Sequence, residues 1–201
     1  MKQNKIIFTF KNTLLVFIIC SFFVGCNLKQ NSIDINHYAI LFKAKELNEN
    51  KKLNNIFIEE PNINRSFNSN SIFYTTKPFL FEEYAKNKWI NLPSSMIYNQ
   101  LIDSFNTSKI FANVISRDSK IEHRYRLKSE IIKLYHSFEE DKSYAILKVK
   151  FDLIEDKKII KSFTYDKKIL SNSNNPYGFV ESINKGFEES INDLLFNISK
   201  I

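Results

Sequence analysis

Apolar side chains occupy every second position of residues 145–153 and alternate with Lys148, Lys150 and Asp152, and this pattern constrains the fold more than any other in the chain. The apolar positions are Ala145, Leu147, Val149, Phe151 and Leu153. Successive side chains of a strand point to opposite faces, so this alternation predicts a strand with one buried face and one face in water. A half-buried strand needs both a pairing partner and a covering layer.

The partner strand follows directly. Glu155-Asp156-Lys157-Lys158 is a polar turn, and apolar side chains then resume at Ile159, Phe163, Tyr165 and Ile169. Residues 144–169 therefore predict a β-hairpin.

A long strand is predicted over residues 125–135, before the hairpin. Tyr125, Leu127, Ile131 and Tyr135 share one parity, whereas Ile132 and Leu134 share the other. Two explanations stay open: a β-bulge near Ile131, or a strand that is buried on both faces.

The last element is predicted to be an amphipathic helix. Asn175, or a nearby Ser or Asn, can cap it, and Pro176 suits the first turn. One apolar stripe runs along it at helical spacing: Phe179, Val180, Ile183, Phe187, Ile191, Leu194, Leu195 and Ile198. A stripe of this kind is buried against a neighbouring layer.

Residues 71–114 contain the other organising pattern. Residues 72–75 predict a strand that ends at Pro78, and an aromatic segment runs from Phe79 to Trp89. Pro93 suits a helix start, because its missing N–H would have no partner there. Ile97, Leu101 and Phe105 follow at helical spacing.

Shorter strands are predicted at residues 38–42, 56–58 and 110–115, with polar loops at 45–54 and 62–70. In the first of these strands, Tyr38, Ile40 and Phe42 would share one face. Two amphipathic helices and an amphipathic hairpin must bury their apolar faces on one another. The predicted fold is therefore α+β: an antiparallel or mixed β-sheet with two amphipathic helices packed on one face.

The same stretch resembles a known family. The matching residues are Ile72, Tyr74, Pro78, Phe81, Tyr84, Lys88, Trp89 and Pro93. Without gaps, they resemble the signature of the ABC-type transport auxiliary lipoproteins, the accessory subunits of MCE (mammalian cell entry) lipid transporters. That family usually has Arg where this chain has Thr75, and often Arg where it has Lys88. Its order of strands and helices is similar to the order predicted here.

The N-terminus predicts a lipoprotein signal over residues 1–25. Lys2, Lys5 and Lys11 precede a short apolar run, and Phe23-Val24-Gly25-Cys26 resembles a lipobox with cleavage between Gly25 and Cys26. Cys26 would then be lipidated, residues 26–36 would form a lipidated tether, and residues 37–201 a single domain. A plain secretory signal with an incidental Cys, or an uncleaved anchor helix, is the alternative.

Cysteine content and charge narrow the class further. The sequence has two cysteines, and Cys20 would leave with the signal, so the mature chain could form no internal disulfide. Removing three of the 29 basic residues and none of the 22 acidic ones lowers the net charge from +7 to +4. This charge is dispersed along the sequence, which argues against a nucleic-acid partner.

No motif for catalysis or cofactor binding is present. The sequence lacks a phosphate-binding Gly-x-x-x-x-Gly-Lys-Ser/Thr loop, a Gly-x-Gly-x-x-Gly loop and a Gly-x-Ser-x-Gly elbow. His37, His123 and His136 lie far apart, and a triad of Asp118, His123 and a serine would be a chance combination. We therefore expect no enzyme, no catalytic or metal site and no cofactor.

The aromatic segment is the candidate partner surface, with Phe79, Phe81, Tyr84 and Trp89 as its members. Large aromatic side chains with a polar tip are favoured as interface anchors. Core packing between the sheet and the first helix is the alternative for the same residues.

Two functions remain open at this stage. The resemblance implies a non-catalytic envelope lipoprotein, facing the periplasm, that acts as accessory subunit of an MCE-type ABC system moving lipids between inner and outer membranes. Its partners would be the MCE-domain protein and, through acylated Cys26, the membrane; a homo-oligomeric ring is one arrangement. The alternative is a stand-alone outer-membrane lipoprotein for envelope assembly or ligand binding. Asn27, in place of an Asp after the Cys, favours the outer membrane.

Overall fold

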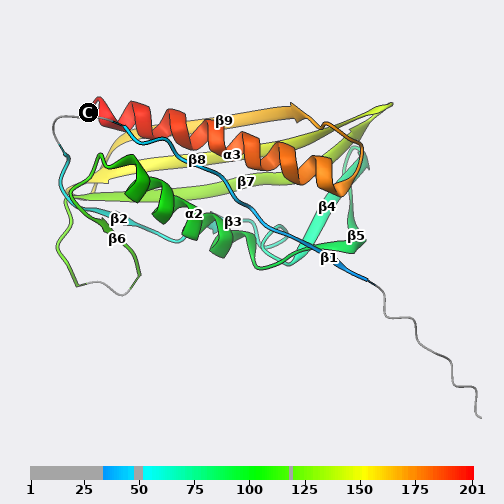
Figure 1. Ribbon diagram of the computed structural model, residues 1–201, viewed down its shortest axis with the longest axis horizontal. Helices are drawn as coiled ribbons and strands as arrows, with labels where there is room; N and C mark the ends of the chain where they lie inside the picture. Colours follow the sequence, from blue (N-terminus) through cyan, green and yellow to red (C-terminus); the bar gives the residue numbers. More distant parts are fainter. Residues whose placement is uncertain (1–33, 48–51, 118–119) are drawn as a thin grey trace, which may run out of the picture. The chain divides into compact units, whose positions relative to one another are not determined.

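The computed structural model describes residues 34–47, 52–117 and 120–201 (Figure 1). Nine strands within these residues form one mixed sheet, and two helices, α2 and α3, accompany it. The predicted α+β fold with a mixed sheet is confirmed. The predicted signal cleavage site, Gly25 and Cys26, lies outside the described residues, as does most of the predicted tether, so both stay predictions.

Three long antiparallel strands make the main part of the sheet: β7 (Tyr125–Glu139), β8 (Lys142–Glu155) and β9 (Lys158–Leu170). The apolar side chains at 145, 147, 149, 151 and 153 are fully buried, as their alternation predicts, and Ile146 on the opposite face is 9% exposed. Asp156 and Lys157 in the β8–β9 turn both have positive φ, 47° and 66°. Two consecutive residues with positive φ match the twist of a tight hairpin, so the predicted polar turn is confirmed.

A β-bulge changes which side chains of β7 face the core. The register with β8 shifts between Ile131 and Lys133, so Ile132 is the extra residue. Leu127 and Ile131 are buried before the bulge, and Leu134 and His136 are buried after it. Of the two predicted explanations, the structure has the bulge, and Tyr135 consequently lies on the opposite face from His136.

Short strands pair with the second edge of β7. β2 (Ile56–Ile58), β3 (Asn62–Ile63) and β4 (Ser71–Lys77) lie parallel to it in succession. The predicted loop at 62–70 was therefore wrong at its start. β3 has only two residues, too few for a readable alternation.

Three more strands complete the sheet. β5 (Leu80–Trp89) lies antiparallel to β4, β1 (Asn36–Tyr38) parallel to β5, and β6 (Val114–Ile115) parallel to β2. β6 is shorter than the strand predicted at 110–115, because Ile110 and Phe111 turn into the core and only an isolated bridge to Leu53 extends the pairing.

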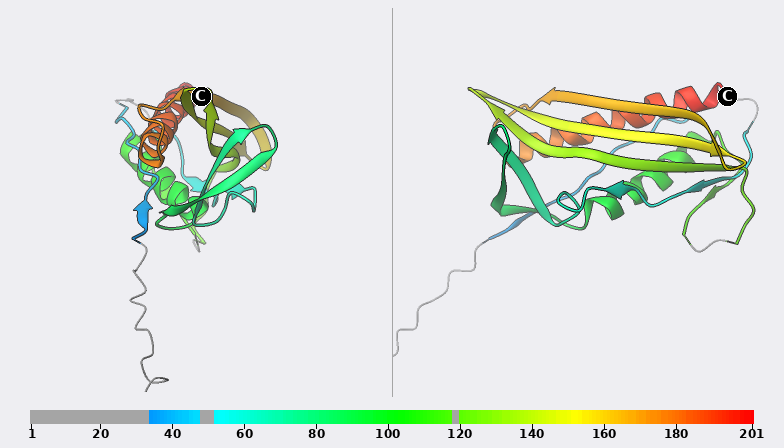
Figure 2. Two further views of the ribbon diagram at one scale, coloured as in Figure 1. Left: turned by 90° about the vertical axis from the view of Figure 1, so that its right-hand side faces the viewer. Right: turned by 180° about the vertical axis from the view of Figure 1, so that it is seen from behind.

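Helices α2 (Pro93–Ser108) and α3 (Pro176–Ser199) lie on the same side of the sheet (Figure 2). The Asn175 side chain caps α3 by accepting from the Gly178 N–H, as predicted. α2 has no cap of its own, and the Asn68 side chain accepts from the Ser94 N–H instead. All eight members of the predicted α3 stripe are buried. No helix in the described residues is both long and apolar enough to cross a membrane.

The segment after β1, residues 39–45, runs along α3 and is called the strap here (Figure 1). A strand was predicted over 38–42, but only Tyr38 belongs to a strand. The predicted alternation is nevertheless present, because Ile40 and Phe42 are buried while Leu41 is exposed. Helix side chains hydrogen-bond to the backbone N–H groups of the strap, so these groups need no neighbouring strand.

Two asparagines of α3 hydrogen-bond to the backbone of the strap, as a neighbouring strand would. Asn184 accepts from the Leu41 N–H at 3.0 Å and donates to the Ala39 carbonyl at 3.3 Å. Asn192 does the same for the Lys45 N–H and the Lys43 carbonyl, at 2.8 and 3.2 Å. Residues eight apart share a face of a helix, so both amides reach the same extended segment.

Candidate functional site

The four predicted surface residues all lie on the β4–β5 hairpin, and its turn holds the first of them. Lys77 pairs with Leu80, which leaves Pro78 and Phe79 as the two turn residues. Phe79 has φ 68° and is 100% exposed. A proline followed by a residue with positive φ is the pattern of a type II turn, which favours Gly or Asn at the position of Phe79. The most exposed aromatic ring thus stands on a strained backbone.

Phe81 belongs to a group of rings on the sheet face that points away from the helices. Its ring lies 5.0 Å from Tyr135 and 5.9 Å from Phe67, and Phe67 lies 5.9 Å from Phe73. Phe81 is 47% exposed and the other three are half-buried. We call Phe67, Phe73, Phe81 and Tyr135 the outer aromatic patch. A groove of about 450 Å³ between the hairpin turn and the end of β7 borders it.

Tyr84 turns to the opposite face, toward the core. Ser71 pairs with Lys88 and Phe73 pairs with Glu83. A step of two positions along β4 is thus matched by a step of five along β5, so β5 bulges between Glu83 and Lys88. The bulge directs the Tyr84 hydroxyl to Nδ1 of His136, 2.8 Å away, and the Tyr84 ring lies tilted against Tyr74, with centroids 4.6 Å apart. Burial raises the pKa of Tyr84, so its hydroxyl stays protonated near neutral pH.

Trp89 is a core residue. It is 2% exposed and its ring lies 6.0 Å from Phe179 of α3. The predicted aromatic surface is thus divided between the two alternatives. Phe79 and Phe81 are available to a partner, Tyr84 is half-buried, and Trp89 packs in the interior, where its ring contacts the last helix. Binding by the exposed members stays a prediction.

Sequence reasoning missed Phe67, Phe73 and Tyr135 as neighbours of Phe81. Tyr135 shares its sequence parity with core residues, and only the bulge at Ile132 turns it outward. Phe67 lies in a predicted loop. A β-bulge near Ile131 was one of the two alternatives for this strand, and it alone could have indicated that Tyr135 faces outward.

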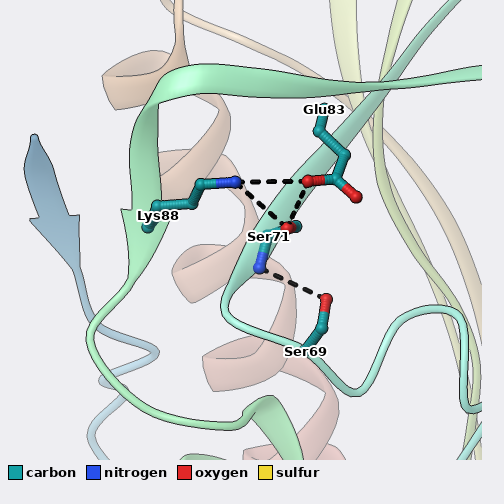
Figure 3. A network of polar contacts seen from close by, with 4 residues as sticks. All are labelled: Ser69, Ser71, Glu83 and Lys88. Carbon is teal, nitrogen blue, oxygen red and sulfur yellow. Dashed lines mark hydrogen bonds and ion pairs between the residues drawn. The ribbon is translucent and has the colours of Figure 1, made fainter.

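A polar network joins the two hairpin strands next to the β5 bulge (Figure 3). Lys88 donates to Ser71 Oγ at 3.1 Å and to a Glu83 carboxylate oxygen at 3.2 Å, and Ser71 Oγ donates to the same oxygen. The bond from Ser71, with that from Lys88, lowers the pKa of Glu83. The Ser69 hydroxyl accepts from the Ser71 N–H. Each of these polar groups has a hydrogen-bond partner within the network. The network therefore links β4 to β5 where their register is irregular, and we call it the Ser71–Glu83–Lys88 clasp.

The histidines are separated in space. His37 is in β1, His123 stacks on Phe57 with centroids 5.2 Å apart, and His136 is in the core. In the part of the chain that the structure describes, no three His, Cys, Asp or Glu side chains gather in a way that could hold a metal ion. Asp118 lies outside the described residues.

Two further grooves lie where β7 begins, with volumes of about 710 and 590 Å³. Their arginines have acidic partners: Arg124 with Glu155, and Arg126 with Glu59 at 3.0 Å. Lys128 and Lys157 also line the second groove, so its positive charge is only partly compensated by these two ion pairs.

Comparisons with known proteins identify the fold. The sequence matches no family model and no curated protein. The structure matches that of XCC0632 from Xanthomonas campestris, a protein of family DUF330, with TM-score 0.70 and 15% identity over 80% of this chain and 92% of that one. An uncharacterised protein matches with TM-score 0.64 and 9% identity over 82% and 99%. The two TM-scores show a shared fold, and at these low sequence identities the likeness extends to the fold alone.

Proposed function

We propose that the protein is a non-catalytic envelope lipoprotein that serves as accessory subunit of an MCE-type ABC system moving lipids between the inner and outer membranes. The outer aromatic patch is the observation that carries the proposal. It places Phe81, which is 47% exposed, among three half-buried rings on the sheet face opposite the helices, at the hairpin that resembles the auxiliary-lipoprotein signature. The fold shared with a DUF330 protein covers 80% of this chain, which supports a single folded domain.

The patch has the features of a docking surface. Phe81 is the most exposed member of the patch, with about half of its surface in solvent, and Phe67 and Tyr135 hold it in edge-to-face contacts that limit its rotamers. A preorganised aromatic side chain loses little conformational entropy on binding. We therefore assign Phe81 as the anchor for the MCE-domain protein.

A tethered domain of this size suits a docking role. Acyl chains on Cys26 would hold the protein at one membrane, facing the periplasm, and the domain would hold the end of a longer MCE assembly close to that membrane. The outer membrane is the location we propose, on the basis of Asn27 after the Cys. No reaction is assigned, because the hydrogen bonds of the Ser71–Glu83–Lys88 clasp are accounted for by hairpin structure.

Photo-crosslinking in the native envelope tests this function. A photoreactive amino acid at position 81 should crosslink to the MCE-domain protein encoded with the transporter. The same amino acid at position 196, an aromatic site of similar exposure on α3, is the matched control. If neither position crosslinks to an MCE component and the wild-type protein never co-purifies with one, the transport role is wrong.

A further inference from the structure

The β4–β5 turn lies at one end of the domain together with two other connections. β4 runs parallel to β7, with Thr75 beside Ser137, so both strands finish at this end. The Asn174 side chain donates to the Asp141 carbonyl in the β7–β8 turn, which brings the segment before α3 to the same place. Figure 2 shows the hairpin beside the tip of β7 and β8. We call this the hairpin end.

Exposed apolar side chains gather at the hairpin end. They are Phe79, Leu80, Phe81, Leu170 and Tyr177. Phe79 is the most exposed of the five, with its whole side chain in solvent. Its position in the turn favours Gly, so turn formation does not account for a phenylalanine there. The ring is placed for contact with something outside the domain.

The chain enters the domain from the side of the hairpin end. β1 lies parallel to β5, with Asn36 beside Asn87 and Tyr38 beside Trp89, so it runs away from the turn. Asn36 is level with the start of β4, and the turn lies about six residues, roughly 20 Å, beyond that level. Ten residues separate Asn36 from Cys26, and an extended chain of that length spans at most about 35 Å. The tether is long enough for the hairpin end to reach the surface that holds Cys26.

The charges at this end are of both signs. Lys77 and Lys142 flank the two turns, Glu140 and Asp141 form the β7–β8 turn, and Glu139 is paired with Lys168. Such a balance gives no strong attraction to anionic lipid, and the two turn carboxylates resist deep burial. A shallow contact with a zwitterionic bilayer fits this charge pattern, because aromatic side chains are favoured at the membrane–water interface.

We propose that the hairpin end contacts the bilayer in which acylated Cys26 is anchored, and that Phe79 inserts into its interface. This inference rests on the lipoprotein part of the proposed function. Insertion would orient the domain on the membrane, with the hairpin turn toward the lipid and the far end of α3 away from it. The outer aromatic patch would then stand beside the membrane, available to the docked partner.

Fluorescence quenching in vesicles tests the insertion. The mature protein, purified from the membranes of its native envelope, is reconstituted as a Phe79→Trp variant in phosphatidylcholine–phosphatidylethanolamine vesicles with brominated acyl chains. Phe196→Trp is the matched control, since Phe196 is an exposed aromatic residue about 30 Å along α3 from the hairpin end. The native Trp89 is buried in both, so the wild-type spectrum is subtracted.

The expected result is a blue-shifted emission of the tryptophan at position 79, with quenching several-fold stronger than at position 196. Equal, weak quenching at both positions, in protein that floats with the vesicles, overturns the insertion and leaves the proposed function standing. Protein that fails to float with vesicles overturns the insertion and the lipoprotein assignment together. Quenching at 79 that appears only with anionic lipid added overturns the zwitterionic contact.

Discussion

The Tyr84 hydroxyl lies 2.8 Å from Nδ1 of His136, and this contact joins the β4–β5 hairpin to the core. The imidazole of His136 is fully buried, its ring lies 5.1 Å from Phe179 of α3, and Nε2 has no hydrogen-bond partner among the described residues. Burial lowers the pKa of His136 from 6.5 to about 4, because a charged imidazolium would lose its hydration there. The attachment of the hairpin thus depends on a neutral histidine.

Stability should fall in acid through His136. Its pKa is lower in the folded state than in the unfolded state, so the unfolded chain binds more protons between pH 6.5 and 4. The contribution is complete above pH 6.5 and is lost as the pH falls toward 4, by about 3 kcal/mol in all. Urea unfolding of wild type and His136→Phe across this range should show a steeper loss in wild type.

Carboxylates with lowered pKa, such as Glu83 and Asp166, add acid sensitivity to both proteins, so only the difference between the two curves reports on His136. Ile131→Val is the control, because it removes one buried methyl at a cost of about 1 kcal/mol and should shift the whole curve without changing its shape. Parallel curves for wild type and His136→Phe would contradict the prediction.

Phe79→Gly should be more stable than Phe79→Ala. Both changes remove an exposed side chain with no packing to lose, but only Gly adopts φ near 68° without strain. We expect a difference of about 1 kcal/mol in the free energy of unfolding. Chemical denaturation of the two variants measures it. An alanine variant as stable as the glycine variant would show that the turn relaxes.

Asn184→Ala should loosen the strap. The change removes both the acceptor of the Leu41 N–H and the donor to the Ala39 carbonyl, at a cost of about 1–3 kcal/mol. Hydrogen exchange at the Leu41 amide should become faster. Asn197→Ala is the matched control on the same helix, because the Asn197 amide donates only to Asp193. Unchanged exchange at Leu41 would mean that the remaining contacts of the strap, namely buried Ile40 and Phe42 and the Asn192 hydrogen bonds, hold it without Asn184.

Trp89→Ala and Phe81→Ala should separate folding from binding. Trp89 is buried, so its truncation should cost about 3–5 kcal/mol of folding stability. Phe81 is half-exposed, so its truncation should leave the fold intact while weakening MCE binding by about 2 kcal/mol or more. Thermal melts and co-purification of each variant measure the two effects. A Phe81 variant that binds normally would remove it as the anchor.

The local patterns of the sequence were sufficient for the main elements. Alternation at 145–153 and the apolar stripe of α3 each repeat over many residues, so burial on one face selects a single period. Asn175 and Pro93 marked the helix starts, because capping and the first turn depend only on neighbouring residues. The change of parity near Ile131 predicted a bulge as one of two alternatives. The α+β class followed because these apolar faces had to cover one another.

Only the tertiary structure decided what the aromatic segment does. Phe79, Phe81, Tyr84 and Trp89 have similar side chains within eleven residues, yet they occupy a solvent-exposed turn, an outer patch, a core hydrogen bond and the helix interface. The bulges in β5 and β7 set which face each side chain meets, and each is a register shift against the neighbouring hairpin strand that the side-chain pattern of one strand does not specify. The strap shows the same limit, because its alternation predicted burial correctly but could not show that helix asparagines, and not a strand, would hold its backbone.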